Sequence, residues 1–310
     1  IEPLIVLVTL LALIAIGAPI FLALGAAGMI GLYMARGSMA LFFGPSSLFA
    51  QLNSFELLAL PLFVLMGNFL SATPVGANLY RAAALWFNRL RGGLAIATVG
   101  ASTVFGAVSG VSIAGVAAIG SIAVPEMLAR GYSHRLAAGA VVSSGALAML
   151  IPPSVPLIIY GAVSGVSVAH LFIGGIVPGV MFAVMFMIVA RFLLRNETKV
   201  IENTRDFDAS LITTSFRKSV WALLVPVIIL GGIYSGIFTP TEAGAVAVVY
   251  AAIVGKFVYG DLEWSDFPTI LAESARTSGM ILVLVIMATA FGRVITLAQI
   301  PADLAGWLTG

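Results

Sequence analysis

The 310-residue sequence contains no cysteine and only two histidines, and just 9% of its residues are charged. Without cysteine there is no disulfide, thiolate nucleophile or cysteine-based metal site. His134 and His170 lie near the ends of apolar segments, and neither has a second histidine or a glutamate at metal-ligand spacing, which disfavours a transition-metal site. The sequence also lacks a phosphate-binding P-loop, so the chain does not itself couple to ATP.

Apolar residues dominate what is present. They make up 61% of the sequence, and the mean hydropathy is +1.13, which indicates a polytopic helical membrane protein with no soluble domain. The net charge of +2 comes from arginines in connecting loops, so we do not interpret it as a nucleic-acid-binding surface. The N-terminal apolar run has no basic leader and no clear small-residue cleavage site, and we expect a membrane span rather than a signal peptide.

Two apolar runs in the region 92–154 are too short to cross a membrane alone. Residues 94–108 and 113–124 number about 15 and about 12, so as helices they reach roughly 22 and 18 Å. A hydrocarbon core of about 30 Å needs about 20 residues. Between the two runs stands the small polar string Ser109-Gly110-Val111-Ser112.

Arginines flank this pair of runs on both sides, and short loops rich in arginine stay cytoplasmic. They are Arg81, Arg89 and Arg91 before the runs, and Arg130 and Arg135 after them. We therefore predict that residues 93–124 form a re-entrant helical hairpin whose tip reaches mid-membrane. Backbone groups without helical partners at that depth are tolerated only against protein or a watery cavity, an arrangement that makes ion and substrate sites.

The segment after the hairpin, residues 136–165, is predicted to be a discontinuous span. It is interrupted at Ile151-Pro152-Pro153-Ser154, and its two pieces should present a helix C-terminus and a helix N-terminus toward the hairpin tip. The dipoles of these two ends would place negative and positive partial charges at mid-membrane.

The other long apolar segments are predicted to span the membrane: residues 3–35, 57–70, 168–190, 220–238, 243–258 and 277–297. The first contains Gly17-Ala18-Pro19 and is predicted to be one kinked, tilted helix. Two short elements are the alternative, which would reverse the predicted cytoplasmic placement of the N-terminus.

Four connecting segments are expected to lie outside the membrane core. Residues 75–91 form a predicted amphipathic helix at the cytoplasmic interface, anchored by Trp86, and residues 259–276 are amphipathic as well. We expect residues 36–56 to be a loop with an interfacial helix. Residues 191–219 have mixed charge and are predicted to be a solvated cytoplasmic linker.

Polar residues in or beside the spans are candidate functional groups. Asn68 either hydrogen-bonds a neighbouring helix or lines a site. Glu242 follows Thr239 and Thr241 in a helix-capping pattern, and a gate or ion-site support is its functional alternative. Ser109 stands in a string similar to a serine-nucleophile motif, but no strand precedes it and no buried base is predicted at its depth. A membrane-embedded hydrolase is thus the weakest function class.

An ion-coupled carrier fits these features best. Na⁺ is a hard cation that suits carbonyl and hydroxyl oxygens, which broken helices with Ser and Thr supply. No Asp or Glu lies within a predicted span as an obvious proton relay, because Glu242 stands at a helix start. We therefore predict coupling to Na⁺ rather than to protons, with no organic cofactor.

Several strings, in the same order along nearly the whole chain, resemble the large membrane subunit of tripartite ATP-independent periplasmic (TRAP) transporters. They are RGGLA at 91–95, AVSGVS at 107–112, AAIGSIAVPEMLARGY at 117–132, LIPPS at 150–154, LFIGGIVPG at 171–179 and GIFTPTEAGAVAVVYA at 236–251.

The resemblance implies an all-α, inverted-repeat fold of the ion-transporter superfamily and an elevator-type, Na⁺-driven symporter in the bacterial inner membrane. Its substrate would be an organic acid such as a C4-dicarboxylate, sialic acid or another sugar acid, delivered by a periplasmic binding protein. A small membrane subunit would be the stationary partner. A superfamily carrier or channel that needs no binding protein is the alternative.

The resemblance also assigns residues and regions to roles. The first Na⁺ site would be formed, mainly through backbone carbonyls, by Ser109, Gly110, Ser112, Gly145, Ala148 and Pro152. The substrate cavity would be bordered by Asn68, Ser109, Pro153 and Ser154, and the gate or ion-site support would be Thr239, Thr241 and Glu242. The regions would be a scaffold with a first arm helix (1–91), half of a transport domain (92–165), further scaffold (166–258), and a second arm with the start of the second transport half (259–310).

The sequence departs from the family pattern in three places. Val111 stands where relatives often carry Ser, which argues against a side-chain ligand there, and Ala148 stands where Gly is usual. Family members also continue through a second hairpin and a second broken helix. We therefore expect the 310 residues to be part of a longer chain and unable to transport alone, because inverted-repeat carriers build their sites between two halves.

Overall fold

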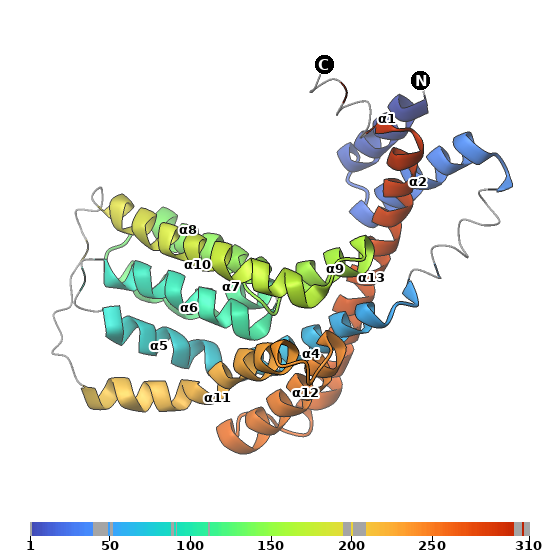
Figure 1. The fold of residues 1–310 in the computed structure, drawn as a ribbon. Helices are drawn as coiled ribbons and strands as arrows, with labels where there is room; N and C mark the ends of the chain where they lie inside the picture. Colours follow the sequence, from blue (N-terminus) through green and yellow to red (C-terminus); the bar gives the residue numbers. More distant parts are fainter. Residues whose placement is uncertain are drawn as a thin grey trace. The chain divides into compact units, whose positions relative to one another are not determined.

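The computed structural model describes residues 2–39, 49, 52–87, 90, 92–110, 112–194, 200, 209–300 and 306. Every regular element in these residues is a helix (Figure 1), which confirms the predicted all-α class. Val111, Arg89, Arg91, most of the predicted interfacial helix in 36–56 and part of the linker, 195–199 and 201–208, lie outside the described residues. The chain divides into two compact units, Ile1–Leu57 with Arg276–Gly310, and Leu58–Ala275.

In the first unit, the N-terminal apolar run forms two helices, α1 (Glu2–Ala15) and α2 (Ile20–Arg36), which pack against each other. The prediction of one kinked helix is therefore wrong, and the alternative of two short elements is right. The reason is local: Gly17 adopts a left-handed conformation with φ 81°, which ends a helix, and Pro19 has no N–H to continue one.

Small residues let α2 approach the last turns of α13 (Asp266–Leu297) within this unit. A Cβ atom at Gly28 would lie 2.9 Å from the backbone nitrogen of Phe291, and one at Gly25 would lie 2.6 Å from Sδ of Met287. Val6, Ala27, Leu32 and Val294 form the buried apolar cluster beside this contact. Close packing through small residues is how helices associate where no water drives them together.

The helix α13 is continuous over 32 residues, so the predicted amphipathic segment 259–276 is helical from Asp266 and runs without a break into the predicted span 277–297. Pro268 falls in the first turn, where a proline is tolerated. Gly279 alone costs only about 1 kcal/mol in a helix interior, too little to break it.

The second unit is a bundle around α6, which contacts the helices on either side of it (Figure 1). The short turn η1 (Phe55–Leu58) ends where this unit begins. The helices of the unit are α4 (Ala59–Ser71), α5 (Val75–Phe87), α6 (Gly93–Ser109), α7 (Ser112–Ala129), α8 (His134–Gly145), η2 (Ala146–Met149), α9 (Val155–Ser164), α10 (Val168–Leu193), α11 (Ala209–Tyr234), α12 (Pro240–Ile253), the π-helical turn η4 (Val254–Tyr259) and the first part of α13.

Among the described residues, three segments are long and apolar enough to cross a membrane: Val168–Leu193, Pro240–Tyr259 and Asp266–Leu297. Phe55–Ser71 and Val75–Phe87 together meet the same criterion but are bent by 66°. In the predicted interfacial segment 75–91, residues Val75–Phe87 form the helix α5. This helix packs along α6 and α11. Its Trp86 is exposed, as an interfacial anchor would be.

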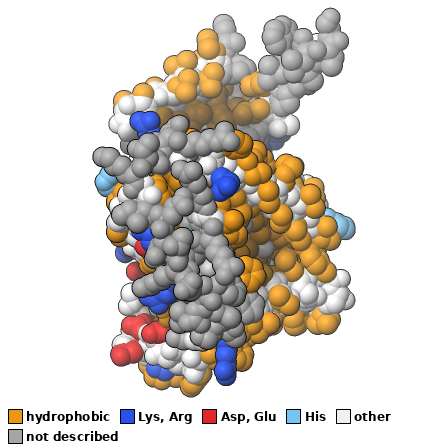
Figure 2. Space-filling view, turned by 90° about the vertical axis from the view of Figure 1, so that its left-hand side faces the viewer, with side chains coloured by type: hydrophobic (Ala, Val, Ile, Leu, Met, Phe, Trp, Pro, Cys, Tyr) orange, Lys and Arg blue, Asp and Glu red, His pale blue; other side chains and the backbone are white. Residues whose placement is uncertain are grey.

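Figure 2 views the molecule from the side that carries the loops before α6 and after α7 in Figure 1, and basic side chains are visible there among apolar ones. One of these loops contains Arg130, which pairs with Glu126 at 2.7 Å. Acidic side chains are visible on the same face, so the cytoplasmic placement of this end stays a prediction from the flanking arginines.

Candidate functional site

The turn between α6 and α7 is built on Gly110. This residue adopts φ 67° and ψ 0°, a left-handed conformation, and its N–H donates to the carbonyl of Gly106 at 2.8 Å. Glycine enters this region without the steric cost that a Cβ atom imposes. The chain therefore ends one helix and starts another within two residues, which produces the helical hairpin expected from the sequence over 93–124.

The chain facing this tip is interrupted, as the Ile151–Ser154 string indicates. After α8 it tightens into η2, leaves helical geometry, and resumes as α9. The amides of Leu150 and Ile151 both donate to the carbonyl of Leu147, at 3.0 and 2.9 Å. The hydroxyl of Ser154, which is fully buried, donates back across the break to the carbonyl of Met149 at 2.6 Å.

The tip and the break are in direct contact. A Cβ atom at Gly110 would lie 2.9 Å from the carbonyl oxygen of Pro153, and one at Gly106 would lie 2.6 Å from Cβ of Ala148. Gly145 on α8 faces the other arm of the hairpin, α7. A Cβ atom at Gly145 would overlap Val116 and lie 3.7 Å from the carbonyl oxygen of Ser112. Side chains larger than hydrogen are excluded at these glycines.

Most residues predicted for the ion site therefore gather at this junction, which we call the tip–break junction: Ser109, Gly110, Ser112, Gly145, Ala148 and the segment from Pro152 to Ser154. Ser109 is fully buried. The junction brings together the C-terminal end of α6, the N-terminal end of α7, the end of η2 and the start of α9. Helix ends contribute opposite partial charges and carbonyl oxygens, which suit a hard cation beside an anion.

The start of α9 differs from an ordinary capped helix end. Its N-cap residue Ser154 makes no side-chain capping hydrogen bond to the helix, since its hydroxyl points back to Met149. Pro156 occupies the first turn of α9. The Ser154 side chain therefore does not cap the positive end of this helix, and an anionic group near that end would be favoured.

Asn68 lies on α4 and donates a hydrogen bond from Nδ2 to Oγ of Ser274 at 2.8 Å, while Ser274 donates to the carbonyl of Ile270 at 2.7 Å. Of the two interpretations of Asn68, the interhelical hydrogen bond is therefore confirmed. Sequence reasoning missed Ser274, because a small hydroxyl residue 206 positions away gives no signal until the fold is known. The substrate-lining role of Asn68 stays a prediction.

Thr239 and Glu242 form a complete capping box at the start of α12. The Glu242 amide donates to Oγ1 of Thr239 at 3.3 Å, and Oε2 of Glu242 accepts from the Thr239 amide and hydroxyl, each at 2.8 Å. The capping interpretation is confirmed. Thr241 is buried, and α12 packs against α4 and α11. A gating role for this segment stays a prediction.

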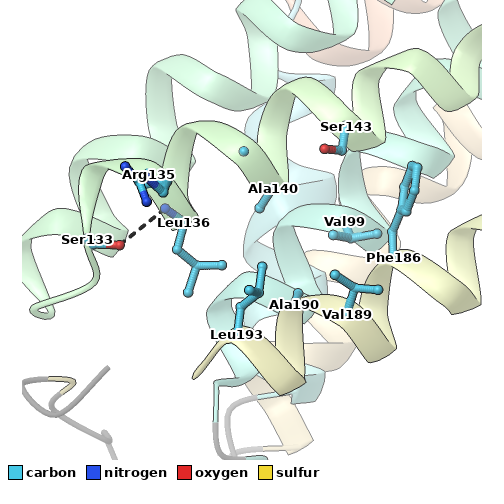
Figure 3. A pocket seen from close by; sticks show the side chains of 11 residues that line it. Val99, Ser133, Arg135, Leu136, Ala140, Ser143, Phe186, Val189, Ala190 and Leu193 are labelled. Atoms are coloured by element: carbon cyan, nitrogen blue, oxygen red, sulfur yellow. Dashed lines mark hydrogen bonds between the residues drawn. The ribbon is translucent and has the colours of Figure 1, made fainter. Parts of the chain in front are cut away.

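A groove that sequence reasoning missed lies between α6, α8 and α10 (Figure 3). It has a volume of about 440 Å³ and is lined by Val99, Ser133, Arg135, Leu136, Gly139, Ala140, Ser143, Phe186, Val189, Ala190 and Leu193. These residues come from the start of α6, the first turns of α8 and the end of α10. The groove is therefore separate from the tip–break junction, which lies at the opposite end of α6.

Fold and junction together define a helical membrane protein with a hairpin and a broken helix meeting at their ends, an arrangement that secondary transporters use. The family of the DctM component of tripartite ATP-independent periplasmic transporters matches residues 7–310. The chain belongs to this family. It is a family of transporter permeases, not of enzymes, so the hydrolase alternative is set aside.

The chain is similar to permease proteins whose names give different substrates. The chain is 42% identical to the C4-dicarboxylate TRAP transporter large permease protein DctM of Pseudomonas aeruginosa over 276 residues. These residues cover 87% of the chain and 64% of that protein. It is 38% identical over 311 residues to the isethionate TRAP transporter permease protein DctMQ of Oleidesulfovibrio alaskensis, covering 100% of the chain and 49% of that protein.

A third relative is the ectoine TRAP transporter large permease protein TeaC of Halomonas elongata, 36% identical over 303 residues, which cover 96% of the chain and 69% of that protein. The chain therefore spans about half to two thirds of the length of these relatives. The family is settled by these matches, and the substrate is not common to them.

Proposed function

We propose that the chain is part of the large permease of a Na⁺-coupled symporter that carries an organic acid across the bacterial inner membrane. The observation that carries this proposal is the contact of the hairpin tip with the helix break, Gly110 against the carbonyl of Pro153. Carbonyl oxygens and helix ends concentrated at one buried point are the groups with which broken-helix transporters hold Na⁺ and anionic substrates.

The cation would be held by main-chain oxygens. Ser109, Gly110 and Ser112 on the hairpin, with Gly145, Ala148 and Pro152 on the facing chain, are the residues we assign to the first Na⁺ site. None of them carries an acidic side chain, so the ligands would be carbonyl and hydroxyl oxygens. The tight contacts of Gly106 and Gly145 support this assignment, because they hold the two backbones at close distance.

The substrate anion would lie next to this cation, at the start of α9. Pro153 and Ser154 precede that helix, and its positive end has no side-chain cap. A carboxylate or sulfonate there would interact favourably with the helix dipole and with first-turn amides. Asn68 would border the same cavity.

Coupling follows if Na⁺ orders the junction before the anion binds. The ion can shift the protein toward a substrate-competent state only by binding that state more tightly, and substrate must then raise the affinity for Na⁺ by the same factor. We assign residues 92–165 to the part that moves across the bilayer, with 75–91 and 259–276 as the arms that connect it to the scaffold.

Two partners are part of the proposal. The family is described as one component of a tripartite transporter, which supports a small membrane subunit and a periplasmic substrate-binding protein. The names of the relatives support a small organic substrate, and C4-dicarboxylates, sialic acid and other sugar acids are the classes to test first, followed by isethionate and ectoine.

The test is uptake into proteoliposomes that contain the full-length protein and its small subunit. A panel of organic acids is supplied with the cognate binding protein, with and without an inward Na⁺ gradient. Uptake that requires both sodium and binding protein supports the proposal and identifies the substrate. Uptake that needs sodium alone favours a superfamily carrier without a binding protein. Uptake that depends on neither sodium nor binding protein would contradict the assignment of a Na⁺ site to the junction.

A further inference from the structure

The groove between α6, α8 and α10 has a polar end and an apolar wall. Figure 3 shows Arg135 and Ser133 at one end and Ser143 and Phe186 toward the other, with Leu136 and the α10 side chains between them. Most of the lining is apolar, and none of the lining residues is acidic. The groove is thus suited to a molecule with one anionic group and a hydrocarbon part.

Arg135 is the charged residue among those that line the groove. It is exposed and makes no ion pair within the described part of the chain, whereas its neighbour Arg130 is paired with Glu126 at 2.7 Å. Arg135 also stands in the first turn of α8, a 12-residue helix whose N-cap is Ser133. The Ser133 hydroxyl already accepts a hydrogen bond from the Leu136 amide at 3.2 Å, so the positive charge at this end of the groove comes mainly from the guanidinium of Arg135.

The depth of the groove matches the polar boundary of the membrane. The basic loop before α8 is predicted to be cytoplasmic, and Ser143 lies eight residues beyond Arg135 in the sequence, so it sits roughly 12 Å further along the helix. The charged end would thus lie at headgroup level and the apolar wall would extend into the hydrocarbon region. The exposed side chains of Val142 and Val189 fit contact with lipid.

We propose that this groove binds an anionic glycerophospholipid of the cytoplasmic leaflet, with its phosphate on Arg135 and an acyl chain along Leu136, Val189 and Phe186. Arginine presents a planar fork of donors that matches phosphate oxygens. Basic pockets between transmembrane helices on the cytoplasmic side are suited to anionic headgroups. A small water-soluble acid would make no use of the apolar wall.

Gly139 allows the groove to be filled without disturbing the bundle. A Cβ atom at Gly139 would meet nothing within 4 Å, and the residue lines the groove, so a leucine there would occupy lipid space. Gly174 on α10 is the matched control, because it is also helical, has nothing within 4 Å of a Cβ atom and does not line the groove. Arg81, an exposed arginine of α5, is the control for charge.

The experiment is native mass spectrometry of the full-length protein with its small subunit, delipidated and then titrated with phosphatidylglycerol or phosphatidylcholine. We expect retained phosphatidylglycerol to exceed phosphatidylcholine, and Arg135→Gln to reduce its affinity about fivefold, the effect of one basic residue at a membrane surface. Gly139→Leu should reduce the binding of both lipids. Arg81→Gln and Gly174→Leu should bind phosphatidylglycerol as the unmodified protein does. Arg135→Lys keeps the charge but not the fork of donors, so it should lose less affinity than Arg135→Gln.

The proposal is overturned if phosphatidylglycerol and phosphatidylcholine bind equally well. It is also overturned if Arg135→Gln and Gly139→Leu bind like their controls. Loss of binding in the two groove variants but in neither control supports it. The readout is lipid binding, so the result is independent of whether the protein couples transport to Na⁺.

Discussion

Two helices of the second unit begin with a hydroxyl residue and a proline, and they begin in opposite ways. At α12, Thr239 and Glu242 satisfy the first turn by a complete capping box, and Glu242 is exposed. At α9, Ser154 is fully buried, its hydroxyl bonds backward to Met149, and no side chain caps the helix. The first start is closed by its own side chains, whereas the second leaves a positive helix end inside the protein.

The difference indicates where function lies. The sequence indicates a helix cap at Thr239 and Glu242, and local hydrogen bonds account for both residues, while a gating role stays a prediction. The start of α9 contains no charged residue, yet it lies against the hairpin tip through Gly110 and Pro153. The proposal is tested by comparing the effects of substitutions at the two helix starts on transport. The largest loss of uptake is expected at the hairpin tip.

Gly110→Ala should reduce Na⁺-dependent uptake most, with the apparent Na⁺ affinity falling about tenfold. The added Cβ would lie 2.9 Å from the Pro153 carbonyl oxygen, and overpacking of this kind typically costs about 1–3 kcal/mol. Uptake at varied Na⁺ concentration in proteoliposomes measures the effect.

Gly165→Ala is its control. Gly165 ends α9 with φ 72°, close to the 67° of Gly110, but a Cβ there would meet nothing within 4 Å. Both variants carry the same left-handed strain, so only the contact with the break differs. Equal Na⁺ dependence in the two variants would show that the tip–break contact does not shape the ion site.

Ser154→Ala should lower uptake about fivefold. It removes the hydrogen bond that closes the break and leaves the Met149 carbonyl without this donor, at a cost of roughly 1–3 kcal/mol. Thr239→Ala, which removes a cap at the other helix start, should lower the melting temperature and leave uptake unchanged. The comparison fails if Thr239→Ala affects uptake as strongly as Ser154→Ala does.

Ser109→Ala should cost less than either change at the tip or the break. We assign the ion mainly to backbone carbonyls, and removing one hydroxyl leaves those carbonyls in place. Uptake and Na⁺ dependence are measured as for Gly110→Ala. An effect equal to or larger than that of Gly110→Ala would indicate that the Ser109 hydroxyl is a direct ligand.

The smallest effect is expected for the pair Asn68 and Ser274. Their hydrogen bond of 2.8 Å joins two helices, and such bonds between membrane helices contribute about 0.6 kcal/mol on average. A double-mutant cycle with Asn68→Ala and Ser274→Ala, read by thermal unfolding, should give a coupling of about this size. Uptake by Asn68→Ala then separates the roles, because a loss that Ser274→Ala does not share supports substrate contact by Asn68.

The sequence predicted the break-bearing elements well because their causes are local. Gly110, which adopts a left-handed conformation, and the Pro152-Pro153 string, which lacks two N–H donors, are local signals for a helix end, and the turn and the break appear where they were expected. The prediction of one helix for the N-terminal run was wrong, because Gly17 in a left-handed conformation ends the first helix and Pro19 has no N–H to continue it. At 276 the helix α13 continues, since amphipathic character changes there without any residue that breaks a helix.

By itself, the sequence determined the all-α class, the positions of the helix breaks, the cap of α12 and the family. These depend on composition, on backbone restrictions at Gly and Pro, and on strings of residues close together in the chain. Only the tertiary structure decided that Gly110 lies against Pro153, that Asn68 donates to Ser274, and that Arg135 borders a groove with Phe186. Such contacts join residues far apart in the chain, and they depend on how helix surfaces pack, which no local pattern specifies.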